Sequence, residues 1–242
     1  MTDLNQNQAP DIDSSTDDYA TRFSGKVGQW FLNVQEQGTL SLLKNIKEAS
    51  ILDVGGGHGQ TLPALIANGY KVTILGSDQS CSKRINPYLN NQNAFFKIGS
   101  LTDIPFPDQS FDVALSYRIL PHLTDWKKLI KELTRVSKNY VLVDFPTLYS
   151  FNLLSSLFFP LKKKIEKNTR TYKIFPEKEI IAEFKTNGFI PAGKYAQFLF
   201  PMALYRAINN HKISSGLETL FRTIGLTQLL GSPVLYLFKK LA

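Results

Sequence analysis

The chain has 242 residues, of which 43% are hydrophobic, 12% aromatic and 20% charged. This composition excludes a disordered protein, a collagen-like repeat and a coiled coil, and the length suits one α/β domain better than two. Lys and Arg number 28 against 20 Asp and Glu, a net charge of +8 that favours an acidic partner such as nucleic acid or an anionic membrane surface.

The chain holds a single cysteine, Cys81, so no intramolecular disulfide can form and a reducing compartment is expected. Residues 1–18 are rich in Asn, Gln, Asp and Ser; we expect them to form a disordered tail without a secretory signal. The most apolar stretch, residues 151–161, is too short to span a membrane. We therefore expect a cytoplasmic protein, and peripheral attachment to a membrane stays open.

Helical and strand patterns alternate through the first part of the chain. Residues 27–47 have apolar side chains at helical spacing, interrupted by Gly38, and predict two helices. The alternation that follows predicts a doubly wound, mostly parallel α/β sheet. Its expected strands are residues 51–54, 71–75, 94–98, 111–115 and 140–143, and its expected helices are residues 61–68, 81–89 and 125–137.

The pattern changes after Asp144. We expect a single domain over residues 19–242, with a core at residues 19–146. The remainder, residues 147–242, is expected to add a helical lid and two strands that bring the sheet to seven. The elements expected there are helices at residues 177–187 and 202–230 and strands at residues 195–200 and 233–238.

A glycine-rich loop, Asp53-Val54-Gly55-Gly56-Gly57-His58-Gly59, follows the first expected strand and precedes a helix. In open α/β sheets a nucleotide-like cofactor binds at this place. A dinucleotide fingerprint needs a small residue where this chain has Gln60, and the Lys-Ser/Thr ending of a P-loop is absent. Asp53 at the strand tip would repel a pyrophosphate and attract an amino group. The loop therefore favours a cationic cofactor.

These residues resemble the first motif of the class I S-adenosylmethionine-dependent methyltransferases, Asp-x-Gly-x-Gly-x-Gly, which Asp53, Gly55, Gly57 and Gly59 match in full. The resemblance covers roughly residues 19–144. It implies a Rossmann-like methyltransferase fold, S-adenosylmethionine as methyl donor and S-adenosylhomocysteine as product. It implies no metal, and no metal-ligand pattern is evident in the sequence.

The resemblance implies further cofactor contacts. Asp78, after the second strand, would bind the ribose hydroxyls. Residues 99–112 are similar to the third and fourth motifs of the methyltransferase type 11, ubiquinone- and menaquinone-biosynthesis-like branch. That branch has an aspartate where this chain has Ser100, so the adenine contact is expected through the Ser100 hydroxyl and the Leu101 backbone. Ser116, at the end of the fourth strand, is also expected beside the cofactor.

Tyr19, Arg22 and Phe23 precede the core in a Tyr-Ala-Thr-Arg-Phe segment. In enzymes that this chain resembles, such a segment covers the methionine moiety, and an arginine pairs with its carboxylate. The alternative is an N-terminal helix that Tyr19 and Phe23 dock onto the core.

His122 follows the fourth strand, at the mouth of the expected site. A histidine there can deprotonate a hydroxyl group near neutral pH. The alternative is a residue that caps the next helix or packs beside the cofactor.

The acceptor must be chosen by the part after Asp144. Residues 1–146 carry 14 Lys and Arg against 15 Asp and Glu, whereas residues 147–242 carry 14 against 5. The aromatic, apolar segment before Lys162–Lys164 favours a small or lipid-like acceptor methylated on oxygen or carbon, less so on nitrogen, or contact with an anionic membrane. Two alternatives stay open, a catalytically silent binding or regulatory protein and an RNA-directed methyltransferase. The oligomeric state is undetermined.

Overall fold

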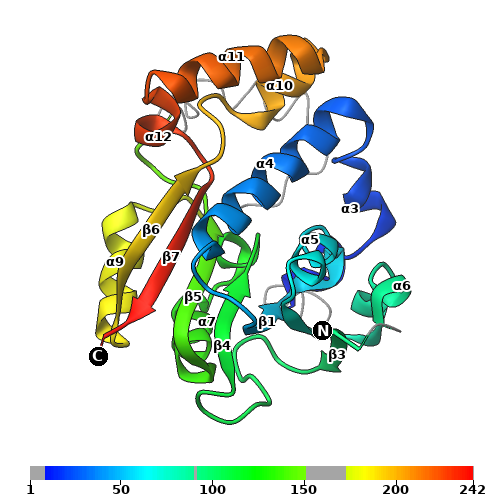
Figure 1. Ribbon diagram of the computed structural model, residues 1–242, viewed down its shortest axis with the longest axis vertical. Helices are drawn as coiled ribbons and strands as arrows, with labels where there is room; N and C mark the ends of the chain where they lie inside the picture. The colour runs from blue at the N-terminus through cyan, green and yellow to red at the C-terminus, as the bar shows by residue number, and fades with distance from the viewer. Residues whose placement is uncertain (1–8, 90–91, 151–172, 242) are drawn as a thin grey trace.

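The structure is a computed structural model that describes residues 9–89, 92–150 and 173–241 (Figure 1). Its strands form a seven-stranded sheet in the order β3-β2-β1-β4-β5-β7-β6. Strands β1 to β5 are parallel, and β7 pairs antiparallel with both β5 and β6, which confirms the expected mostly parallel sheet. The strands are β1 (Ser50–Val54), β2 (Lys71–Gly76), β3 (Ala94–Ile98), β4 (Phe111–Ser116), β5 (Ser137–Phe145), β6 (Phe189–Ala196) and β7 (Val234–Lys240).

Helices cover both faces of the sheet. Buried side chains of α7 and α9 share a core with one face, those of α4 and α5 with the other, and a third cluster joins α4 to α10. Within the described ranges, no helix is long and apolar enough to cross a membrane. After α2 and α3, the helices are α4 (Gly25–Leu43), α5 (Leu62–Ala67), α6 (Asn86–Leu89), α7 (Trp126–Val136), α9 (Glu177–Thr186), α10 (Met202–Ile208), α11 (His211–Thr223) and α12 (Leu226–Leu230), with 3-10 turns η1 (Gly56–His58), η2 (Gln79–Ser82) and η3 (Leu120–His122).

Helix α4 is one helix of 19 residues where the sequence predicted two, so the expected break at Gly38 is wrong. A Cβ at Gly38 would lie 2.5 Å from the ring of Tyr195 and 2.7 Å from the side chain of Leu235. Gly38 is therefore the residue that lets α4 lie close to β6 and β7.

Strand β6 begins at Phe189, whereas the sequence predicted a strand at residues 195–200. The two overlap at Tyr195 and Ala196 only. Strand β6 is an edge strand that contains Pro191 and has a register irregularity between Pro191 and Gly193. Proline is tolerated at edges and bulges, and these residues masked the strand pattern.

The helical segment expected over residues 202–230 is divided into α10, α11 and α12. Asn209 follows α10 with a left-handed backbone, φ 47°. Gly225, between α11 and α12, also has a left-handed backbone, φ 81°. The expected helix at residues 81–89 is likewise split between η2 and α6. Short helices separated by such residues share one apolar periodicity, and the sequence pattern did not resolve them.

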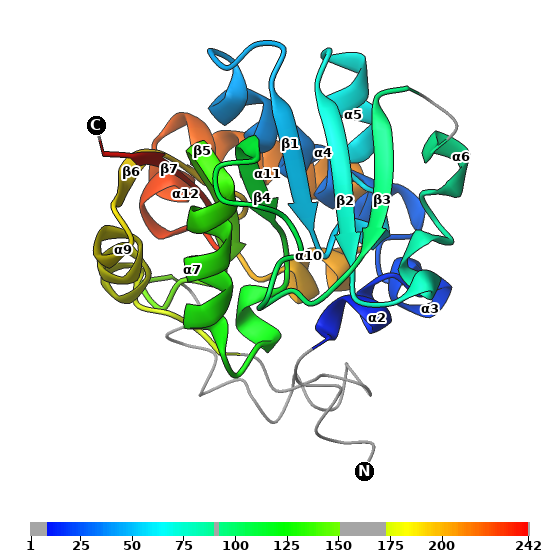
Figure 2. The ribbon, with the colours of Figure 1, turned by 90° about the horizontal axis from the view of Figure 1, so that it is seen from below.

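Residues 10–18, expected to belong to a disordered tail, are folded as α2 (Pro10–Ser14) and the start of α3 (Asp17–Thr21). Asp11 is fully buried, and its carboxylate accepts the N–H of Ser77 at the end of the sheet. Figure 2 shows α2 and α3 beyond the arrowheads of β1 and β2. The composition of this segment is that of a tail, but its acidic residues have partners in the folded core.

Candidate functional site

The glycine-rich loop between β1 and α5 lies at the carboxyl end of the sheet, where the strand order reverses between β1 and β4. Gly55 and Gly59 have left-handed backbones, φ 79° and 70°, which glycine adopts without a steric penalty. The Gly55 N–H donates to the Leu75 carbonyl, and a Cβ at Gly55 would lie 2.6 Å from Ile119. The loop therefore brings main chain, and little side chain, to the crevice.

Asp53, near the end of β1, is a buried carboxyl group. It is 4% exposed, and burial raises its pKa from 3.8 to about 7. A Cβ at Gly56 would lie 2.2 Å from Asp53 Cγ, so the glycine lets the loop fold over this group. A buried carboxyl group with a raised pKa at a strand end is typical of a ligand site.

Asp78 follows β2 at the same end of the sheet. Its Oδ1 accepts the Ser80 N–H at 2.8 Å, which caps η2, and hydrogen bonds from Ser80 lower its pKa. Because Asp78 is also exposed, it is an ionised hydrogen-bond acceptor at neutral pH. Asp53 and Asp78 thus differ sharply in environment, although one lies near the end of β1 and the other just after β2.

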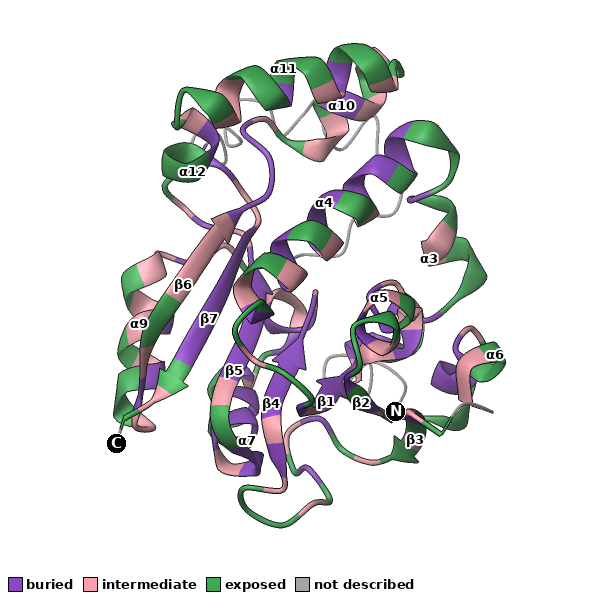
Figure 3. Ribbon diagram, viewed as in Figure 1, coloured by how far each residue is buried: buried purple, intermediate pink, exposed green. Residues whose placement is uncertain are grey.

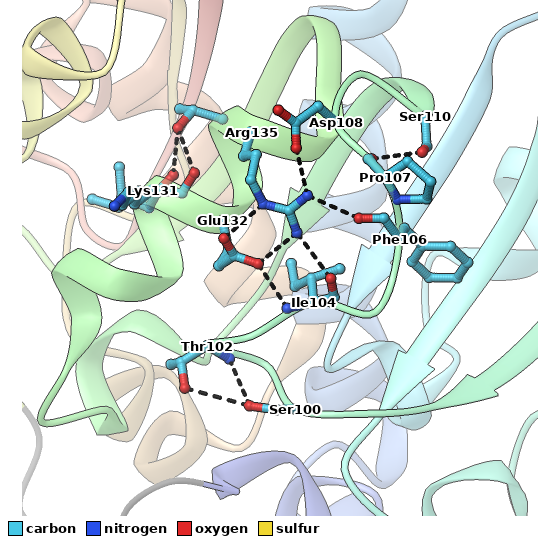
Figure 4. A network of polar contacts seen from close by, with 12 residues as sticks. Ser100, Thr102, Ile104, Phe106, Pro107, Asp108, Ser110, Lys131, Glu132 and Arg135 are labelled. Atoms are coloured by element: carbon cyan, nitrogen blue, oxygen red, sulfur yellow. Dashed lines mark hydrogen bonds and ion pairs between the residues drawn. The ribbon is translucent and has the colours of Figure 1, made fainter.

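The loop between β3 and β4 is fixed by an arginine of α7 (Figure 4). Arg135 donates to two carbonyls of this loop at 2.8 Å and pairs with Glu132 at 2.7 Å. Glu132 in turn accepts the Ile104 N–H at 2.7 Å. The network holds the loop that starts with Ser100, which is exposed, and Leu101, which is fully buried.

A cluster of polar side chains surrounds Arg118, directly after β4. Its Nη2 donates to the Oε1 atoms of Gln35, at 2.8 Å, and of Gln60, and its guanidinium lies 4.3 Å from the ring centroid of Phe23. Its own N–H donates to Asp144 Oδ1 at 2.5 Å. The cluster joins α4, the glycine-rich loop, and the ends of β4 and β5.

Arg118 has two features typical of a functional position. Its backbone is left-handed, φ 61°, a conformation that is costly for a large side chain and is often found at binding sites. Its Nη1 is buried without a hydrogen-bond partner among the described residues. Burial raises the pKa of the neighbouring Asp144 to about 6, although the Arg118 charge and N–H oppose this shift. Arg118 is therefore held by several groups while one of its nitrogens stays available.

Tyr19 and Phe23 pack edge-on against His58 of the glycine-rich loop, with ring centroids 5.7 and 5.5 Å apart. Burial, followed by the charges of Arg118 and Arg84, lowers the pKa of His58 to about 3, so this histidine is neutral. The expected docking of the Tyr19–Phe23 segment onto the core is thus present.

His122 ends the η3 turn after β4. Burial lowers its pKa, and the positive charge of Arg22 lowers it further. A neutral imidazole at pH 7 can accept a proton, which a general base requires.

Helix α2 lies in the crevice at the strand ends. A Cβ at Gly57 would lie 2.2 Å from Ser15 Oγ, and one at Gly55 would lie 3.4 Å from Asp11 Cβ. The cavity that remains beside the loop has a volume of about 20 Å³ and is lined by Asp53 and Arg118 among others. Such a volume holds about one water molecule, whereas pockets for small molecules measure roughly 300–1,000 Å³.

Comparison with known proteins agrees with this geometry. Residues 52–142 match a family model described as a methyltransferase domain. An uncharacterized methyltransferase of Schizosaccharomyces pombe is 32% identical over 109 residues, which are 40% of this chain and 39% of that protein.

Residues 52–142 are thus similar to a methyltransferase domain.

Solved structures show that the fold of this domain extends over most of the chain. A methyltransferase from Haloferax volcanii, solved with the Trm112 activator, has a TM-score of 0.63 at 16% identity and covers 97% of this chain and 99% of its own. Magnesium protoporphyrin IX methyltransferase of Synechocystis, with bound S-adenosylhomocysteine, has a TM-score of 0.62 at 12% identity and covers 89% of this chain and 85% of its own. The chain therefore has the class I methyltransferase fold, while it spans about two fifths of the curated relative that it matches.

Of the residues that the motifs indicated, Asp53, Gly55 and Gly59 line the cavity beside the loop. The Ser116 hydroxyl is fully buried and donates to the Val54 carbonyl at 2.9 Å, so its side chain joins β4 to β1. The exposed guanidinium of Arg22 lies over the Tyr19 ring, 5.0 Å from its centroid. Gly57 belongs to the same loop and Tyr19 to α3, whereas the segments that follow β2, β3 and β4 contain Asp78, Ser100, Leu101 and His122.

Sequence reasoning missed the polar cluster and the buried acid of α2. Gln35 and Gln60 lie in helix and loop patterns that carry no motif, and Asp11 lies in a tail-like composition. Asp144 did carry a signal, because it is a carboxylate at the carboxyl end of a central strand.

Proposed function

We propose that the chain is an S-adenosylmethionine-dependent methyltransferase. The observation that carries this proposal is Asp53, a buried carboxyl group with a raised pKa beneath a glycine-rich loop, at the reversal of strand order in a methyltransferase domain. A buried carboxylate is stable only when a cation or several donors accompany it. The α-amino group of S-adenosylmethionine would be that cation.

The methionine end of the cofactor fits the residues around Asp53. Arg118 Nη1 is buried and has no hydrogen-bond partner in the part of the chain that the structure describes, and Arg118 and Asp53 line the same cavity. A guanidinium in this position would take the α-carboxylate, while Asp53 takes the α-amino group. Arg118 replaces Arg22 in this role, because Arg22 is exposed and stacked on Tyr19.

The adenosine end fits the second and third strands. Asp78 would accept hydrogen bonds from the ribose hydroxyls, and Ser100 with the Leu101 backbone would contact the adenine. The Ser77 Oγ, next to Asp78, is buried, and no described residue forms a hydrogen bond with it, as expected of an atom that a ligand would reach.

The cofactor supplies a methyl group that its own sulfonium charge activates. The residues of the chain have to hold donor and acceptor in line and exclude water, which is what Tyr19, Phe23 and the glycine-rich loop would do. For a hydroxyl acceptor, His122 would take the proton at its neutral imidazole.

The acceptor class rests on the second part of the chain. We propose an oxygen or carbon of a small or lipid-like apolar molecule, and the excess of Lys and Arg in residues 147–242, 14 against 5 Asp and Glu, would suit a lipid-like acceptor or an anionic membrane surface. The apolar residues 151–161 and Lys162–Lys164, on which the sequence argument rested, lie outside the described residues.

Peripheral membrane contact has support among the described residues. An apolar stripe on and just after α11 is solvent-exposed, and the outer side of α11 is largely green in Figure 3. Its residues are Ile213, Leu217, Leu220 and Ile224. Sedimentation with phosphatidylglycerol vesicles tests this contact. The double variant with Leu220→Ser and Ile224→Ser should bind less than wild type, and Thr223→Ala should bind equally. Equal sedimentation of wild type, the double variant and Thr223→Ala would contradict the contact.

A catalytically silent binding protein is the second candidate, and the α2 helix in the crevice favours it. Titration calorimetry with S-adenosylhomocysteine discriminates between the two. We expect the full chain to bind, Asp53→Ala to lose at least a hundredfold in affinity, and Asp112→Ala, at the far end of β4, to bind as wild type. Absence of heat both from folded wild-type protein and from a variant freed of the α2 contact, Asp11→Ala, would contradict the methyltransferase proposal.

A further inference from the structure

The N-terminal segment fills the place where the proposed cofactor would lie. We infer that residues 10–18 act as a built-in competitor of S-adenosylmethionine, so that α2 must leave the crevice before the cofactor can enter. This inference rests on the proposed function, because it concerns the same crevice.

The first contact is the Asp11 carboxylate. Asp11 is fully buried, its Oδ2 accepts the Ser77 N–H at 2.7 Å, and Cys81 Sγ donates to the same oxygen at 3.4 Å. Ser77 directly precedes Asp78, the residue proposed for the ribose. An acid of the chain therefore occupies donors at the adenosine end of the crevice.

The second contact is made by Ser15 with the glycine-rich loop. Ser15 is 3% exposed, and its hydroxyl lies 2.2 Å from the position of a Cβ on Gly57. The same Cβ would lie 2.5 Å from the Cys81 carbonyl, so Gly57 is enclosed between α2 and η2. The loop surface that a cofactor would cover is thus in contact with protein.

The hold on α2 is weak enough to be reversed. Helices α2 and α3 have five residues each, too few to be stable alone. Within residues 9–89, 92–150 and 173–241, Asp11 Oδ1 is buried without a hydrogen-bond partner, which opposes the closed state. Asp17 pairs with Lys83 and Arg84 at 2.8 Å, but Asp17 and Lys83 are largely exposed, and such pairs contribute little.

Competition of this kind lowers the apparent affinity for the cofactor by the fraction of molecules in which the crevice is open. A change that weakens α2 should therefore tighten binding, and a change that fixes α2 should abolish it. Mutations of cofactor-binding residues only weaken binding, so the gain in affinity is specific to a competitor.

The releasing variant is Asp11→Ala, in the full chain. It removes the acceptor of the Ser77 N–H, and we expect the Kd for S-adenosylhomocysteine to fall about tenfold. Asp18→Ala is the matched control, because Asp18 is an exposed acid of the same segment, and its Kd should stay at the wild-type value.

The locking variant is Ser15→Cys. A Cβ on Gly57 would lie 2.2 Å from Ser15 Oγ and 3.0 Å from Cys81 Cβ, so a thiol at position 15 would lie close to Cys81, the single cysteine of the chain. Oxidised glutathione would take two electrons and two protons from the two thiols, becoming two reduced glutathiones, and leave a disulfide between α2 and η2. Binding should be lost after oxidation and restored by dithiothreitol, while oxidised wild-type protein should bind as before.

The outcomes separate this inference from the proposed function. Tighter binding by Asp11→Ala, together with loss of binding in oxidised Ser15→Cys, supports the competitor. If Asp11→Ala, Asp18→Ala and oxidised Ser15→Cys all bind as wild type, the competitor is refuted and the methyltransferase proposal stands. If no form binds, Asp11→Ala included, the cofactor proposal fails and the competitor fails with it.

Discussion

Two buried carboxyl groups, Asp53 in the crevice and Glu218 in α11, have opposite surroundings. Glu218 is 3% exposed and accepts hydrogen bonds from the Leu199 N–H at 3.0 Å and from the Tyr205 and Thr227 hydroxyls at 2.6 Å each. Arg222 lies 3.6 Å away. Asp53 is 4% exposed, no ion pair joins it to any described residue, and burial raises its pKa to about 7.

The difference distinguishes a structural acid from a binding acid. The partners of Glu218 come from the segment after β6 and from α10, α11 and α12, so its charge joins the C-terminal cover together. Asp53 does not connect segments of the fold in this way, and its ionisation lowers the free energy of unfolding. Burial with partners indicates a role in folding, and burial without them indicates that a ligand completes the site.

The largest expected effect tests the cost of Asp53 in the free protein. Because its pKa is raised in the folded state, the contribution of Asp53 to the free energy of unfolding is fully present below pH 3.8 and is lost as the pH rises through 7. Asp53→Asn, which does not titrate, should gain stability over wild type by on the order of 4 kcal/mol between pH 4 and pH 8. Urea unfolding at both pH values measures the gain, and a constant difference between the two proteins would contradict the raised pKa.

Glu218→Ala should have the next largest effect. It leaves three donors without their acceptor, and we expect the free energy of unfolding to fall by about 3 kcal/mol and Tm by roughly 10 °C. Affinity for S-adenosylhomocysteine should not change. Thr219→Ala, an exposed neighbour, is the control. A stability equal to that of the control would remove the contrast between the two acids.

A smaller effect is expected from Arg118, which connects the crevice to the polar cluster. Arg118→Met should raise the Kd for S-adenosylhomocysteine about tenfold, since one charge-assisted hydrogen bond is lost. Arg22→Met removes the same charge from an exposed position and should change the Kd less than twofold. Titration calorimetry compares the two, with Arg118→Lys as a milder variant. If Arg22→Met lost more affinity than Arg118→Met, Arg22 and not Arg118 would bind the α-carboxylate of the cofactor.

The sequence indicated the part of the site that follows strand ends. Asp53 and Asp78 were recognisable because strand, loop and helix occur in a fixed order. The glycines of the loop between β1 and α5 added to the signal, because they allow the main chain to approach a ligand. The sheet was predictable for the same reason, since each expected strand of the first five overlaps an observed one.

The rest depends on contacts between distant residues. Gly38 breaks a helical pattern in the sequence, yet it lies inside α4 because Tyr195 approaches it. Asp11 and Glu218 both look like surface acids in sequence, and only the positions of Ser77 and Tyr205 make them interior. Burial of a polar residue is set by its tertiary partners, and local composition does not contain them.

The central claim is that the α-amino group of the cofactor pairs with the Asp53 carboxylate. The number of protons released on binding tests this claim most directly. At pH 7 a carboxyl group with a pKa of about 7 is half protonated, and a cation bound beside it would ionise it. Calorimetric titrations with S-adenosylhomocysteine in buffers of different ionisation enthalpy should show about half a proton released per site by wild type, and none of that release in Asp53→Asn. Binding by wild type without proton release, or with the same release in Asp53→Asn, would contradict the account.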